Sequence, residues 1–201
     1  EGTNWYNNIL KTAPMQNYSV SLSTGTEKVS SSTILTYFTQ DGVLLNTGMQ
    51  RFSLRSNNEY RPNSHLKIGL NLAPTYQLDH NTRSGTDGSR QVIGISTAAS
   101  PLISIRNSDG GYNSRASSFG MLGMSNPVQQ LELLNGNQNT IRLLTNLYGE
   151  LEIIKNLRFK SSFNIDLGNA EFNQFFGTMY GPGLNPPILP RPASQNSSTH
   201  N

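Results

Sequence analysis

The stretch that decides the fold is LRFKSSFNIDL, residues 157–167. Apart from Ser161, its odd-numbered positions hold Leu, Phe or Ile, and its even-numbered positions are all polar or charged. Successive side chains of a β-strand point to opposite faces, so this alternation predicts a strand with one apolar and one polar face. Helical spacing, which groups apolar residues at every third or fourth position, does not fit.

Other segments repeat the pattern. Alternation recurs at residues 18–22, 52–60, 66–73 and 141–153, although Leu144 and Tyr148 blur the last of these. Residues 29–39 are rich in β-prone side chains without two distinct faces. The sequence therefore predicts an all-β fold, an antiparallel meander of about six strands.

The predicted connections fall into two lengths. Residues 25–28, 61–65 and 155–156 are short and rich in Gly, Pro or Asn, as tight turns are. Residues 40–50, 79–140 and 168–201 are long. In an antiparallel meander all the tight turns then lie at one end of the sheet. Short periplasmic turns and long extracellular loops are typical of outer-membrane β-barrels. A soluble or secreted β-sandwich used for binding or adhesion is the alternative, since its strands alternate too.

These lengths predict the organisation of the chain. A Pro-Gly-rich tail begins near residue 181, and Asn126-Pro127 opens a short helix that ends near Gly136. We expect an extracellular loop segment at 1–15, four barrel strands in 16–79, a long extracellular loop at 80–139 with a short helix near 126–135, two barrel strands in 140–168 and an extracellular loop at 169–201.

Composition excludes several classes of protein. Charged residues are 13% of the 201 residues, about half the share of roughly 25% in soluble domains. There is no cysteine, so disulfide frameworks and thiol chemistry are excluded. The net charge of +3 comes without a basic run, which argues against nucleic-acid binding. No apolar run reaches the roughly 18 residues of a membrane helix.

Catalytic and metal-binding patterns are missing from the sequence. His65, His80 and His200 are far apart, and none belongs to a motif that brings two ligands to one helix face. There is no G-x-S-x-G nucleophile elbow. We therefore expect no metal, no cofactor and no enzymatic activity.

Short motifs follow one another in the order found in a known family. They are GTNW (2–5), TAPMQNYSVS (12–21), GTEK (25–28), GMQRFSLR (48–55), LKIGLNL (66–72), NP (126–127), LTNLYGE (144–150) and LRFKSSF (157–163). In this order they resemble the SusC/RagA family of TonB-linked outer-membrane transporters, over residues 1–167 with gaps in the long loop. One departure is VSSS at 29–32, where the family often carries tyrosines.

The resemblance implies that the chain is an internal fragment of a larger barrel. Family members have an N-terminal plug inside a barrel of about 22 strands, whereas six strands cannot close a barrel. It further implies a transporter in the bacterial outer membrane that imports glycan or peptide nutrients. Its partners would be a SusD-like surface lipoprotein, TonB acting through the absent plug region, and the lipid of the outer membrane.

Two sets of residues are candidates for function. Aromatic residues in the predicted loops could stack on cargo or contact the lipoprotein, and packing among the loops is the alternative; these are Trp5, Tyr112, Phe119 and Tyr180. Polar residues on the predicted inner face could contact the plug or line the transport path, and mutual salt bridges are the alternative; these are Arg55, Lys67, Arg142, Glu150, Lys160 and Asp166.

Overall fold

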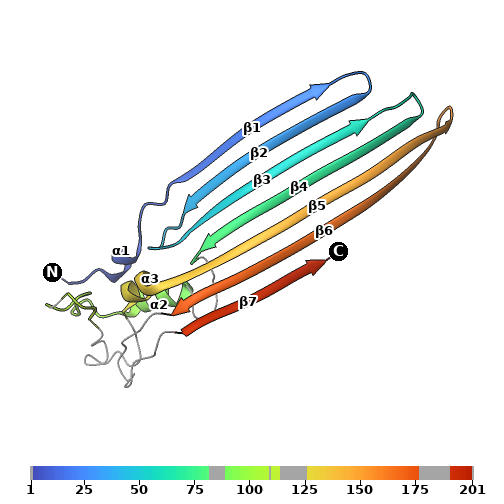
Figure 1. Cartoon of the computed structure of the whole chain (residues 1–201). Coiled ribbons are helices and arrows are strands. Elements are labelled where there is room, and N and C mark those ends of the chain that lie inside the picture. The colour runs from blue at the N-terminus through green and yellow to red at the C-terminus, as the bar shows by residue number, and fades with distance from the viewer. Residues whose placement is uncertain (1, 82–88, 109, 114–125, 177–190, 201) are drawn as a thin grey trace.

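The computed structural model describes residues 2–81, 89–108, 110–113, 126–176 and 191–200. They form one 7-stranded sheet in which every strand pairs antiparallel with the next along the chain (Figure 1). The strands are β1 (Met15–Gly25), β2 (Val29–Asp41), β3 (Gly48–Tyr60), β4 (Leu66–His80), β5 (Leu134–Ile154), β6 (Leu157–Phe176) and β7 (Arg191–His200). The predicted all-β meander is confirmed.

The structure has a seventh strand beside the predicted meander of about six, and this strand lies within residues 169–201, which were expected to form a loop. β6 continues to Phe176, and β7 pairs with it from Leu167 opposite His200 to Phe176 opposite Arg191. The sequence RPASQNSSTH has no apolar alternation, so nothing in its own pattern indicates a strand. Residues 191–200 form a strand because their backbone pairs with that of β6. β5 also begins at Leu134, several residues before the predicted position 140.

Three tight turns join β1 to β2, β3 to β4 and β5 to β6, all at the same end of the sheet (Figure 1). In the first turn the Thr26 hydroxyl accepts hydrogen bonds from the backbone N–H groups of Lys28 and Val29. In the second, Asn63 Oδ1 accepts from the N–H groups of His65 and Leu66 at 2.9 Å. In the third, Asn156 has φ +69°, a left-handed conformation that asparagine tolerates. Local polar side chains therefore fix these turns.

Three short helices form a cap at the opposite end of the sheet (Figure 1): α1 (Trp5–Ile9), α2 (Ser89–Ala98) and α3 (Pro127–Leu133). The α3 helix begins directly after Asn126, because Asn126 Oδ1 accepts hydrogen bonds from the N–H groups of Val128 and Gln129. Segments far apart in sequence share the cap core, which consists of Ile9, Leu44, Val92, Val128 and Leu131.

The buried apolar side chains of the described residues lie mainly in this cap. Among the described side chains of the sheet, Phe172 is the one large hydrophobic side chain that is buried. The apolar face of the sheet is not covered by a second layer in the part of the chain described. This disfavours a β-sandwich, whose apolar faces pack on each other. No helix among the described residues is long and apolar enough to span a membrane.

Candidate functional site

The first half of the candidate site is the apolar face of the sheet. Pairing registers place Leu70, Leu147 and Phe163 in one row across β4, β5 and β6. Their alternating neighbours point to the other face. Large side chains on the apolar face are strongly exposed, among them Val20, Leu22, Leu35, Phe52, Leu147, Leu151, Phe159 and Phe163. An apolar surface of this extent marks an interaction with a partner or a membrane.

An aromatic row crosses the apolar face on the side of the cap. Tyr18, Tyr37, Phe52 and Tyr76 are successive cross-strand partners on β1 to β4. The rings of Tyr18 and Tyr37 are stacked with centroids 6.4 Å apart, and those of Tyr37 and Phe52 are 4.6 Å apart. Beyond this row, toward the cap, the same face carries Gln16, Thr39 and Gln50 on β1 to β3, and Leu78 follows on β4. Aromatic side chains at such a boundary suit an interface between an apolar medium and water.

The apolar band runs obliquely across the strands. On β1 its last member toward the tight turns is Leu22, which lies in one cross-strand row with Ile165 of β6 through intervening partners. On β6 the apolar side chains continue beyond Ile165 to Phe163, Phe159 and Leu157. When strands are tilted, a level apolar band meets each successive strand at a different position along its length. The shift of the band from β1 to β6 therefore fits strands inclined to the normal of that band.

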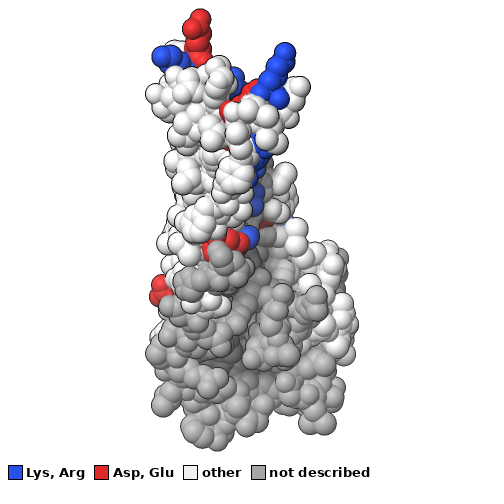
Figure 2. Space-filling view, turned by 90° about the vertical axis from the view of Figure 1, so that its right-hand side faces the viewer, with Lys and Arg blue, Asp and Glu red and all other residues white. Residues whose placement is uncertain are grey.

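The second half of the candidate site is the polar face, which carries a charged cluster at the tight-turn end: Glu59, Arg61, Lys67, Glu150, Glu152 and Arg158. The Lys67 ammonium lies 3.6 Å from both Glu59 and Glu150. The Arg158 guanidinium lies 3.5 Å from both Glu150 and Glu152. Figure 2 shows charged side chains gathered at this end. With three acidic and three basic members, the charged cluster is balanced.

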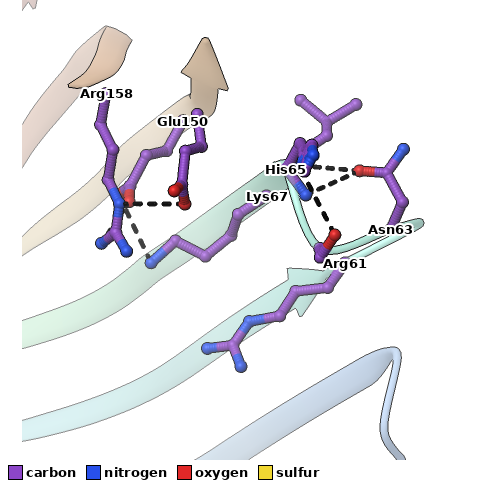
Figure 3. A pocket seen from close by; sticks show the side chains of 9 residues that line it. Arg61, Asn63, His65, Lys67, Glu150 and Arg158 are labelled. Carbon is purple, nitrogen blue, oxygen red and sulfur yellow. Dashed lines mark hydrogen bonds and ion pairs between the residues drawn. The ribbon is translucent and has the colours of Figure 1, made fainter. Parts of the chain in front are cut away.

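All members of the charged cluster except Glu59 line a hollow of about 380 Å³ together with the turn between β3 and β4. Figure 3 shows Lys67, Glu150 and Arg158 pointing toward one another, with Asn63 and His65 on the side of the turn. These side chains come from three strands and one turn, so the cluster ties neighbouring strands together. Exposed pairs of this kind stabilise weakly one at a time and more as a network.

Tyr148 belongs to the polar face because Gly69 leaves room for its ring. A Cβ atom added at Gly69 would lie 2.1 Å from the Tyr148 ring, so the ring covers the glycine. The Tyr148 hydroxyl donates a hydrogen bond of 3.0 Å to Glu59. The ammonium groups of Lys67 and Lys160 lie 5.9 and 5.2 Å from the ring centroid, within cation–π range. Tyr148 thus joins the charged cluster to the middle of the sheet.

A row of asparagines crosses the polar face nearer the middle of the strands. Asn57, Asn71, Asn146 and Asn164 are successive cross-strand partners on β3 to β6, and we call them the amide row. Asn71 Nδ2 donates to Asn146 Oδ1 at 3.1 Å, and Asn146 Nδ2 donates to Asn164 Oδ1 at 2.6 Å. The row lines a hollow of about 480 Å³. Amides both donate and accept, so this row can bind peptide groups or sugar hydroxyls.

No family model matches the chain. Two curated relatives are TonB-dependent receptors P26 and P3 of Formosa agariphila. The chain is 29% identical to P26 over 171 residues, which is 85% of this chain and 16% of the relative. It is 26% identical to P3 over 179 residues, which is 86% of this chain and 17% of the relative. The chain therefore spans about one sixth of the length of these receptors.

Solved structures share the fold. The RagAB peptide importer in the closed-closed state matches 100% of this chain and 22% of its own, with a TM-score of 0.72 and 18% identity. The chain is similar to part of a SusC/RagA-like TonB-dependent receptor. The open-open state of RagAB matches 87% of this chain and 20% of its own, with a TM-score of 0.66 and 20% identity. At these identities the structural match shows the RagA-like fold.

The predicted polar residues all lie on the polar face of this RagA-like sheet. Lys67 and Glu150 belong to the charged cluster, and Lys160 is the cross-strand partner of Glu150. Arg142 binds Asp166 through two hydrogen bonds of 2.9 and 2.7 Å. Arg55 and Asp166 line the hollow beside the amide row. These ion pairs match the alternative given above for the polar candidates, in which they form salt bridges with one another.

Of the predicted loop aromatics, the structure describes Trp5 and Tyr112, and each of them contacts other residues of the chain. Trp5 is 4% exposed, and its indole N–H donates to the carbonyl oxygen of Ser100 at 2.8 Å. The Tyr112 ring lies under the Arg106 guanidinium at 4.3 Å, and its hydroxyl bonds to Glu132. Burial, and then the bond to Glu132, raise the pKa of Tyr112 above its ordinary value. These contacts favour packing among the loops. Phe119 and Tyr180 lie outside the described residues.

Glu59, Gly69, Tyr148 and the amide row are members of the site that were not predicted from the sequence. Glu59 has the same parity as Arg55 on the strand predicted at 52–60, so this parity could have assigned Glu59 to the polar face. The other members depend on cross-strand register, which a single sequence does not give. Within the described ranges, no three His, Asp or Glu side chains are grouped as metal ligands are.

Proposed function

We propose that this chain forms part of the barrel wall of an outer-membrane nutrient transporter. The observation that carries the proposal is the division of one sheet into an exposed apolar face and a face of ion pairs and amides. In a transmembrane barrel the apolar face contacts lipid and the polar face lines the interior. Similarity to TonB-dependent receptors supports the same assignment.

In this proposal the tight turns face the periplasm and the helical cap lies outside the cell. Barrels of this class have short periplasmic turns and longer extracellular loops. The three described tight turns lie at one end, and the cap lies at the other. The chain would therefore cross the outer membrane of a bacterium several times, with its aromatic row at the outer interface.

The polar face then contacts either the plug or the cargo. The balanced charged cluster offers partners for charged side chains of a plug, and the amide row offers donors and acceptors along the transport path. The matching solved structures are of a peptide importer, RagAB. We propose that the whole protein imports a peptide or glycan with a SusD-like lipoprotein and is driven by TonB through its plug. No covalent chemistry is part of this role, and the protein is not an enzyme.

Spin labelling of the full-length protein in vesicles tests the assignment of the faces. Cysteines at Leu70 and Phe163 should give labels relaxed by oxygen, because these positions would face lipid. Matched labels at Lys67 and Ser162 should be relaxed by a water-soluble nickel complex. The reverse pattern, or no access of either reagent to Leu70 and Phe163, would contradict a lipid-facing barrel wall and favour a packed interior.

A further inference from the structure

A cavity of about 290 Å³ lies where the cap meets the sheet, and the transporter role described above does not use it. Its walls come from β2, β3, β4, the connection between β2 and β3, and the segment before β1. They include Lys11, Thr39, Asp41, Asn46, Gln50 and His80. The apolar members of the lining are Met49 and Leu78, and most of the other side chains carry hydroxyl, amide, imidazole or charged groups. These groups favour a polar ligand.

The strand side chains of the lining point mainly to the apolar face. Thr39 and Gln50 each lie two residues beyond an aromatic residue of the row, Tyr37 and Phe52, and are cross-strand partners. His80 lies on the same parity as Tyr76. Because alternate side chains share a face, the cavity opens on the side of the aromatic row and directly beyond it.

This position corresponds to the headgroup layer of a bilayer. Two residues of a strand span about 7 Å, and the headgroup region on each side of the hydrocarbon is roughly 5–8 Å thick. If the aromatic row marks the edge of the hydrocarbon, Thr39 and Gln50 lie at the level of lipid headgroups. A lipid can reach this cavity from the side without entering the barrel.

The charges of the cavity disfavour a phosphate. Lys11 is the one Lys or Arg in the described lining, and its ammonium lies 3.1 Å from the Asp41 carboxylate. Phosphate recognition relies on cationic donors that are not already neutralised. Sugar hydroxyls both donate and accept, which matches a lining that combines a carboxylate with amide and hydroxyl groups.

The walls of the cavity are held in place by side-chain contacts. The ring nitrogens of His80 lie 2.7 Å from Asn137 Oδ1 and 3.1 Å from Asn46 Oδ1. Asn46 Nδ2 also donates to the carbonyl oxygen of Leu131 in α3. The Lys11–Asp41 pair fastens the segment before β1 to β2. A site whose walls are already ordered loses less entropy when it binds a ligand.

We propose that this cavity binds the sugar headgroup of a glycolipid in the outer leaflet. The proposal rests on the proposed function, because it needs the apolar face to contact lipid. The acyl chains of the glycolipid would lie on the apolar face beside Phe52 and Tyr76, and its sugar would bond to Thr39, Gln50 and neighbouring polar groups. The glycolipid is bound and is neither transported nor altered.

Two substitutions in the full-length protein test the site. Thr39→Val keeps the shape of the side chain and removes its hydroxyl, and Gln50→Leu removes an exposed amide. Gln16→Leu is the matched control, because Gln16 is the cross-strand partner of Thr39 in the same row and does not line the cavity. Binding of monoglucosyl diacylglycerol to the detergent-solubilised proteins is measured by native mass spectrometry.

We expect Thr39→Val and Gln50→Leu each to weaken glycolipid binding about fivefold and Gln16→Leu to leave it unchanged. Phosphatidylglycerol and methyl glucoside serve as probes for a phosphate site and for a site for free sugars. The proposal would be overturned if all variants bound the glycolipid equally, or if phosphatidylglycerol bound more strongly than the glycolipid. It would also be overturned if methyl glucoside, which has no acyl chains, bound as strongly as the glycolipid. Oxygen access of a spin label at position 163, measured in the same preparations, tests the barrel assignment separately. If the label is accessible to oxygen but the glycolipid does not bind, the headgroup site is wrong and the barrel assignment stands.

Discussion

The two faces of the sheet are built from the same strands and behave in opposite ways. On the apolar face, side chains such as Phe163 are largely exposed, and their interactions depend on the apolar surface area that they present. On the polar face, Lys67, Tyr148 and Asn146 each have named partners at defined distances. The apolar face therefore tolerates exchange among apolar residues and resists charge, whereas the polar face depends on which partner each residue meets.

The largest expected effect is the insertion of a charge on the apolar face. Phe163→Lys should lower the free energy of unfolding by about 2–4 kcal/mol, because a charge near the middle of a bilayer is poorly solvated. Ser162→Lys, one residue away on the polar face, should change it little. Urea titration of the full-length protein folded into vesicles measures both. Equal losses would show that the two faces have the same surroundings.

The contact between Gly69 and Tyr148 should give the next largest effect. Gly69→Ala places a methyl group against the Tyr148 ring, so the ring must move and its hydroxyl loses Glu59. Overpacking of this kind costs about 1–3 kcal/mol. Gly149→Ala is the control, since a Cβ there meets nothing within 4 Å. Unfolding in urea compares the two variants, and similar stabilities would contradict the role assigned to Gly69.

The amide row should contribute less. Asn146→Ala removes one hydrogen bond to Asn71 and one to Asn164, and a loss of about 1 kcal/mol is expected because both bonds compete with water. The control is Asn169→Ala on the apolar face, where the described residues offer Asn169 no side-chain hydrogen bond. If the control variant loses as much stability in the same titration, the row has no structural role.

The smallest effect is expected in the charged cluster. Lys67→Met removes the ammonium between Glu59 and Glu150, and its side chain is 29% exposed, so the loss should stay below about 1 kcal/mol. The loss should shrink as salt is added, because salt screens exposed pairs. Lys28→Met at the first turn is the control. A loss that does not depend on salt would indicate packing of the Lys67 stem in place of electrostatics.

Much of the fold could be predicted from the sequence because alternation is a local property. Residues 157–167 predict their own strand and its two faces, and the Asn and Thr residues of the turns specify them through bonds to neighbouring backbone groups. The parity of the polar candidates also followed from alternation alone. None of these conclusions needed knowledge of which strand lies beside which.

Register and long-range packing were decided only by the tertiary structure. β7 has no pattern of its own and forms because β6 offers backbone partners. Tyr148 breaks the alternation of its strand because Gly69 on β4 leaves space for a ring. The cap core joins Ile9, Leu44, Val92 and Leu131 from four separate segments. Such contacts link residues far apart along the chain, and their free energy depends on three-dimensional proximity, which a local sequence pattern does not encode.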